Sequence, residues 1–220
     1  MSQDLLELLA DGLLETFYMV GASSAIAFLI GLPLGVILSI SAPASVLPNR
    51  PLYGTLSLLV NIGRSVPFII LMVAIIPFTR LIVGTSIGTN AAVVPLAVSA
   101  IPFVGRVAES ALREIDGGII EAAQSMGATP FEIIVKVMLP EALPAMIAGA
   151  TLTVINLIGY SAMAGAIGGG GLGDIAIRYG YQRFMPAIML ITVVMLVLMV
   201  QLFQFLGDKW SAAARHDRNG

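Results

Sequence analysis

The chain has no cysteine, one histidine and few charged side chains. Charged residues make up 11% of its 220 residues, against 58% hydrophobic residues. The absence of cysteine excludes disulfides, thiolate metal sites and iron–sulfur clusters. A net charge of -2, with scattered basic residues, gives no indication of nucleic-acid binding. This balance is typical of a membrane protein and not of a soluble domain.

Long stretches without charge run through the sequence. Four carry no charged residue and a fifth carries one arginine; they cover residues 16–49, 81–105, 142–173, 184–207 and 51–79. A spanning helix needs about 20 mostly apolar residues, and lipid forces the spanning backbone to be helical. The sequence therefore predicts an all-α, polytopic membrane protein with five transmembrane helices, at about 16–40, 52–79, 89–112, 142–164 and 185–206.

The predicted organisation is one transmembrane domain, residues 13–207, with short flanks and a long loop, 116–140, before the fourth span. Residues 1–12 have leucines at helical spacing with acidic residues between them. They are predicted to form an amphipathic lead-in at the membrane surface, or alternatively a polar entry turn. Residues 208–220 form a polar tail.

The basic residues predict the orientation. Residues 1–49 contain no lysine or arginine and have no positive signal-peptide region. With five spans the termini lie on opposite sides, and an outside N-terminus satisfies the positive-inside rule. It places in the cytoplasm Arg50, Arg113, Lys136, Lys209, Arg215 and Arg218, and leaves outside Arg80, Arg178 and Arg183. We therefore expect a periplasmic N-terminus and a cytoplasmic C-terminus and loop.

The loop 116–140 contains start and stop signals for two short helices. Asp116 is a good N-cap, and Gly127 is placed to end the first helix in the left-handed conformation. Thr129-Pro130-Phe131-Glu132 is a capping box with proline at the first helical position. Leu139-Pro140 is predicted to end the second helix. The loop therefore predicts a compact protruding knob.

The knob has the features of a docking element. Ala122 and Ala123 are small and permit close approach of a partner, while Glu121 supplies a charge for a polar rim. The alternative is an ordinary inner loop whose helices pack on their own domain.

The chain has no sequence signal for nucleotide binding. A phosphate-binding loop needs Gly-Lys-[Ser/Thr], but the only lysines, Lys136 and Lys209, lie in other contexts. The glycine-rich segment 168–173 has no lysine. We therefore expect no enzyme activity and no cofactor bound by this chain, so that any ATP hydrolysis would belong to a partner.

A few polar residues within the spans are candidates for a translocation path. Arg64 costs about 2.5–3.5 kcal/mol at mid-bilayer, so it either lines a polar path or extends to the inner headgroups. Asn156, Tyr160 and Ser161 form a polar stripe, and Met163 is a candidate gate. The alternative for this stripe is helix packing. Separately, Arg106, Glu109 and Arg113 have helical pair spacing and are predicted to neutralise one another at the headgroups.

Several motifs together resemble one family. The loop resembles the cytoplasmic loop of bacterial ABC-importer permeases. The matching pattern is Glu121-Ala122-Ala123, three residues, Gly127, nine residues and then Val137-Met138-Leu139-Pro140. PFTRLIVGTSIG (77–88) and TLTVINLIGYSAMAGAIGGGGLGDIAIRYGYQRF (151–184) resemble the methionine permease subgroup of type I ABC importers. The resemblance extends from about Leu13 to Gly207.

This resemblance implies a permease subunit that imports methionine, L or D, across the bacterial inner membrane. It implies a type I importer fold with cytoplasmic coupling helices, in a homodimer with two ATPase subunits and a periplasmic or lipid-anchored binding protein. The positions that match the coupling loop are Glu121, Ala122, Ala123, Gly127, Leu139 and Pro140. The alternatives are an ABC permease for another small amino acid or organic solute, and a secondary transporter, for which neither an ion site nor internal repeats are visible.

Overall fold

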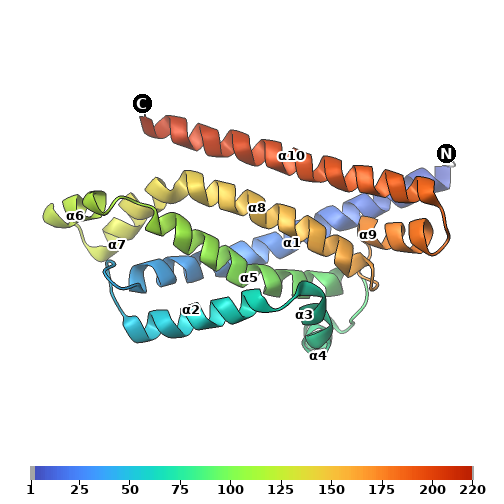
Figure 1. Ribbon diagram of the computed structural model, residues 1–220, viewed down its shortest axis with the longest axis horizontal. Coiled ribbons are helices and arrows are strands. Elements are labelled where there is room, and N and C mark those ends of the chain that lie inside the picture. Colours follow the sequence, from blue (N-terminus) through green and yellow to red (C-terminus); the bar gives the residue numbers. More distant parts are fainter. Residues whose placement is uncertain (1–2, 220) are drawn as a thin grey trace.

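The computed structural model describes residues 3–219, which are helical almost throughout and contain no strand within that range (Figure 1). The elements are α1 (Gln3–Ser41), α2 (Arg50–Ser65), α3 (Phe68–Ala74), α4 (Ile76–Val83), α5 (Thr89–Arg113), α6 (Gly117–Ser125), α7 (Pro130–Glu132), the π-helical turn η1 (Ile133–Met138), α8 (Leu139–Gly165), α9 (Gly171–Ile175), the π-helical turn η2 (Ala176–Tyr181) and α10 (Pro186–Asn219). The predicted all-α fold is confirmed.

Four of the described helices are long and apolar enough to cross a membrane, and a bent pair, α2 with α3, brings the number to five. Figure 1 shows α6 and α7 at one end of the molecule, together with the end of α10, whereas α1 starts at the opposite end. The chain is therefore a polytopic membrane protein whose loop knob lies at the same end as the last turns of α10.

The predicted second span, 52–79, is divided into separate helices in the structure. Its helix ends at Ser65, and α3 leaves at 100° to α2. Proline disfavours helical geometry in the residue before it, and Val66 accordingly has φ -80° and ψ 122°. Pro67 therefore breaks the span within the apolar run, and Pro77 lies in the first turn of the separate helix α4.

The first span also differs from the prediction. The segment expected as a surface lead-in continues into the span as one helix, α1, and its Leu9 is buried against Ile175 and Ile188. This part of the chain therefore packs on α9 and α10.

The prediction that Leu139-Pro140 ends a helix is wrong, because the chain is helical from Pro130 to Gly165. The π turn precedes the proline, and the Leu139 N–H bonds to the carbonyl of Ile134, five residues earlier. A proline ring normally clashes with the carbonyl four residues before it. The wider π turn displaces that carbonyl, so the helix continues through Pro140.

Helix α5 lies at the centre of the domain, with α1, α2 and α8 packed around it. Gly31 and Gly35 of α1 form a close contact with it: a Cβ on Gly35 would lie 2.6 Å from the carbonyl oxygen of Gly105. Small residues allow helices to approach this closely in lipid, where burial of apolar surface gives no gain.

Candidate functional site: a loop knob and an intramembrane cavity

The first helix of the knob is defined by its caps. Asp116 Oδ1 accepts a 2.8 Å hydrogen bond from the N–H of Gly118. At the other end Gly127 has φ +82°, and the N–H groups of Gly127 and Ala128 donate to the carbonyls of Gln124 and Ala123. This is the Schellman pattern, which needs a left-handed residue at its turn. The predicted cap and turn are confirmed.

The second part of the knob begins with the predicted capping box, which is also confirmed. Thr129 Oγ1 accepts from the N–H of Glu132, and Glu132 Oε2 accepts from the N–H of Thr129, at 3.3 and 3.1 Å. Lys136 Nζ lies 2.9 Å from Glu132 Oε1. Bonding to Lys136 first, then to Thr129, lowers the pKa of Glu132 to about 2. This exposed loop residue is therefore a carboxylate at any physiological pH.

The side chains that the knob presents differ from those expected. Glu121 and Ala122 are exposed, but Ala123 is buried in an apolar cluster beneath the knob. Leu139 packs partly against the same cluster, and Pro140 is exposed. Ala123 therefore holds the knob on its own domain and does not face a partner.

Two large apolar side chains of the knob are strongly exposed, and the sequence interpretation did not single them out. Met126 is 82% exposed and Phe131 is 73% exposed, on either side of the Gly127 turn. The available signal was an apolar residue on each side of a turn at a water-exposed loop.

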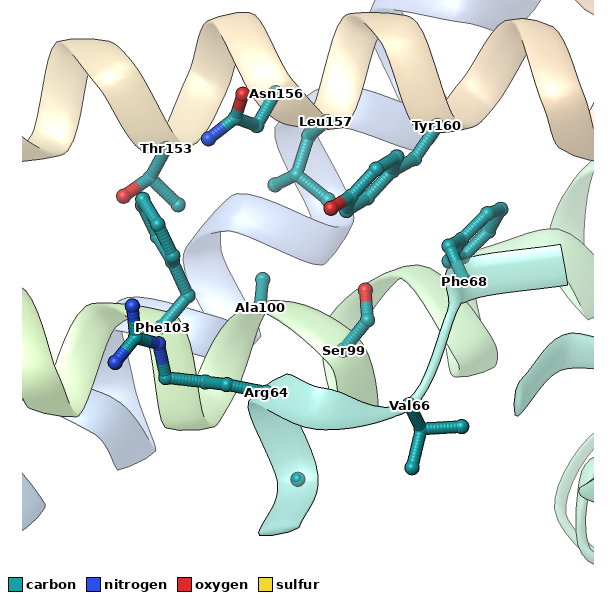
Figure 2. A pocket seen from close by; sticks show the side chains of 11 residues that line it. Arg64, Val66, Phe68, Ser99, Ala100, Phe103, Thr153, Asn156, Leu157 and Tyr160 are labelled. Atoms are coloured by element: carbon teal, nitrogen blue, oxygen red, sulfur yellow. The ribbon is translucent and has the colours of Figure 1, made fainter. Parts of the chain in front are cut away.

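A cavity of about 230 Å³ lies between α2, α3, α5 and α8. Figure 2 shows Arg64 on one side of it, with Asn156 and Tyr160 on the facing helix α8. Three of the predicted path residues therefore line one cavity. Phe103 also lines it, and the Arg64 guanidinium carbon lies 5.9 Å from the centre of that ring.

The other two predicted path residues do not line this cavity. Ser161 is buried, and its hydroxyl donates a 2.7 Å hydrogen bond to the carbonyl of Ile158. Met163 is half-exposed and follows Asn156 by seven residues, so it lies on the same helical stripe two turns further along.

Further cavity residues were missed because they come from other helices. Ser99 and Phe103 of α5 lie one turn apart, and Phe68 of α3 stacks on Tyr160 with ring centres 4.7 Å apart. Their types carry no signal in the sequence, since isolated serine and phenylalanine are common in apolar helices.

The predicted charge cluster forms, but in the interior. Glu109 is 1% exposed and lies 2.6 Å from Arg106 and 3.5 Å from Arg113. Its Oε1 also accepts a hydrogen bond from Tyr53, and Arg106 donates to Ser57 and Asn61 of α2. The expected neutralisation is confirmed, and Glu109 is the buried centre of a polar network between α5 and α2.

The glycine-rich segment is held at the opposite end of the molecule from the knob. Glu15 accepts a 2.6 Å hydrogen bond from the N–H of Gly171, and Thr16 accepts one from the N–H of Leu172. Gly170 and Gly171 have positive φ, which other residues adopt only with strain. The segment is thus a backbone turn fixed by α1. Within residues 3–219, no group of three or more His, Cys, Asp or Glu side chains is arranged to hold a metal ion.

Comparison with known proteins agrees with this architecture. The family described as binding-protein-dependent transport system inner membrane component matches residues 31–213. The chain belongs to this family. Its members are transport components, so the chain is a transport subunit rather than an enzyme.

Individual members of the transport family match over most of their length. The probable D-methionine transport system permease protein MetI of Vibrio cholerae is 57% identical over 202 residues, which are 92% of this chain and 90% of the relative. The D-methionine transport system permease protein MetI of Escherichia coli K12 is 54% identical over 165 residues, 75% and 76% of the two chains. A solved structure of inward facing conformations of the MetNI methionine ABC transporter has a TM-score of 0.95 at 52% identity, covering 97% of this chain and 99% of that one.

Proposed function

We propose that this chain is the permease subunit of an ATP-driven importer that carries methionine, L or D, across the bacterial inner membrane. The observation that carries the proposal is the 57% identity, over 92% of the chain, to a relative named as a D-methionine permease. The match to a methionine ABC transporter across 97% of the chain supports it.

In this proposal two copies of the chain form the translocation path, and each knob docks on a cytoplasmic ATPase subunit that uses ATP and magnesium. The exposed Glu121 and Ala122 supply the rim of the docking surface, and Met126 and Phe131 supply its apolar contacts. A periplasmic or lipid-anchored binding protein delivers the substrate at the opposite end. The N-terminus is periplasmic and the C-terminus cytoplasmic, because this orientation keeps most basic residues inside.

Co-purification tests the partner and uptake tests the substrate. The tagged chain is purified in mild detergent as wild type, Gly127→Val and Gly117→Val. Both glycines have open space around them, but only Gly127 has positive φ, where a β-branched residue is strained. We expect an ABC ATPase to co-purify in equal copies with the wild-type chain and with Gly117→Val. Much less of the ATPase should co-purify with Gly127→Val.

Uptake is measured in a host that lacks its own methionine importers, with L- and D-methionine and a panel of other amino acids. We expect ATP-dependent methionine uptake that other amino acids do not inhibit. A lone polypeptide without an ATPase at any salt concentration, or transport of a different solute, would contradict the proposal.

A further inference from the structure

The charge of Arg64 has no counter-ion in the described part of the chain. Its guanidinium makes no hydrogen bond or ion pair there, and it lies over the face of the Phe103 ring. By contrast, Arg106 and Arg113 pair with Glu109, and Arg178 pairs with Asp174. An ionisable side chain inside a membrane is normally paired or functional, so Arg64 has the character of a ligand-binding residue.

Arg64 lies at the far end of α2 from Arg50, the residue that is predicted to lie on the cytoplasmic side. It follows Arg50, the first residue of α2, by 14 positions, which is about 21 Å along a helix at 1.5 Å per residue. The apolar core of a bilayer is about 30 Å thick. The side chain therefore lies far from the headgroups at the Arg50 end, directly before the break at Val66-Pro67.

The remaining cavity wall combines unused polar groups with apolar surface. The side chains of Asn156 and Tyr160 make no hydrogen bond to any described residue, and both line the cavity with Arg64. Leu157 and the stacked rings of Phe68 and Tyr160 add apolar wall. A cation, free hydrogen-bonding groups and apolar walls match the carboxylate, the ammonium and the side chain of an apolar amino acid.

We propose that this cavity is a binding site within the permease for a zwitterionic amino acid with an apolar side chain, and that Arg64 pairs with its carboxylate. The Asn156 amide and the Tyr160 hydroxyl hydrogen-bond the polar end, and the rings of Phe68 and Tyr160 contact the side chain. The site deepens the proposed function, because it gives the permease its own contact with methionine after the binding protein releases it.

The test is equilibrium binding of radiolabelled methionine to the permease with its ATPase in lipid nanodiscs, without binding protein. Methioninol, in which a hydroxymethyl group replaces the carboxylate, is the competitor. Loss of a charge-assisted hydrogen bond weakens binding by about tenfold or more. We expect wild type to favour methionine over methioninol by that factor, Arg64→Gln to abolish the preference, and Arg64→Lys to retain part of it. Arg50→Gln on the same helix is the matched control and keeps the full preference.

Correct folding of each variant is checked by its elution profile and by its co-purification with the ATPase in equal copies. The proposal is overturned if Arg64→Gln keeps the full preference, or if the wild-type complex binds no methionine at saturating concentration. Uptake driven by the binding protein is measured in parallel. If methionine uptake is normal but no methionine binds in the nanodiscs, the cavity is not a binding site and the proposed function stands. If methionine binds in a way that depends on Arg64 but is not taken up, the binding site is supported and the proposed function is rejected.

Discussion

Replacing Glu109 with glutamine removes one negative charge from a buried site that joins α5 to α2. The carboxylate is 1% exposed and lies 2.6 Å from Arg106, which also donates to Ser57 and Asn61 of α2. Glutamine keeps the volume of the side chain. The substitution therefore leaves Arg106 without its counter-charge and does not create a cavity.

The size of the effect follows from the exposure of each partner. Breaking a buried ion pair on one side costs about 3–5 kcal/mol. The Arg106 side chain is 23% exposed, so water reaches it and the cost lies at the lower end. The second pair is longer, 3.5 Å, and the Arg113 side chain is 54% exposed, so it adds less than about 1 kcal/mol. We expect a loss of about 3 kcal/mol, or a fall in Tm of roughly 6–12 °C for a chain of this length.

The assay is thermal denaturation of the purified protein in detergent, followed by the fraction that elutes as a single species after heating. The matched control is Glu114→Gln, which removes the same charge five residues later at an exposed position. A double variant, Arg106→Met with Glu109→Leu, removes both charges and should recover most of the loss. The reasoning is refuted if Glu109→Gln lowers Tm no more than Glu114→Gln, or if the double variant is less stable than the single one.

Three further variants test other parts of the structure. Gly35→Leu forces a side chain against the carbonyl of Gly105 and should lower the free energy of unfolding by about 3 kcal/mol. Its control, Gly21→Leu, has nothing within 4 Å of the added Cβ and should leave Tm unchanged. Equal Tm values for the two variants would contradict the packing. Phe131→Ser should leave Tm unchanged and weaken ATPase binding about tenfold in a pull-down titration; undiminished binding would exclude this contact. Pro140→Ala restores a backbone N–H and should convert the π turn to regular helix. We expect this variant to transport less methionine per ATP hydrolysed. An unchanged ratio would show that the π turn has no role in coupling.

What the sequence predicted well depends on residues within a few positions of one another. The cap at Asp116, the turn at Gly127 and the pairing of Glu109 with Arg106 were all predicted because each involves neighbours on one helix or turn. Hydropathy gave the five apolar segments for the same reason. It could not give the 100° bend after Ser65, because a proline inside an apolar run is compatible with a kinked or a broken span.

The cavity was only half predicted, because its wall joins helices that are distant in sequence. The spacing of Asn156 and Tyr160 placed them on one face of α8. Nothing in that spacing shows that Arg64 and Phe103 lie opposite them, since these contacts depend on how α2 and α5 pack. The same limit explains Ala123, whose neighbours in the apolar cluster come from α5 and η1.

The knob and the cavity share one helix. From Pro130 to Gly165 the chain is helical without interruption, and Asn156 lies 26 residues from the start, about 39 Å along the axis. A helix is stiff over this length, so a displacement of the knob moves the cavity wall that carries Asn156 and Tyr160. Two irregularities lie between them: the π turn before Pro140, and Pro144 inside α8. Phe131 of the knob and the cavity residues Asn156 and Tyr160 therefore lie on one continuous helix, and a change of conformation at the π turn would alter how a displacement of the knob reaches the cavity wall.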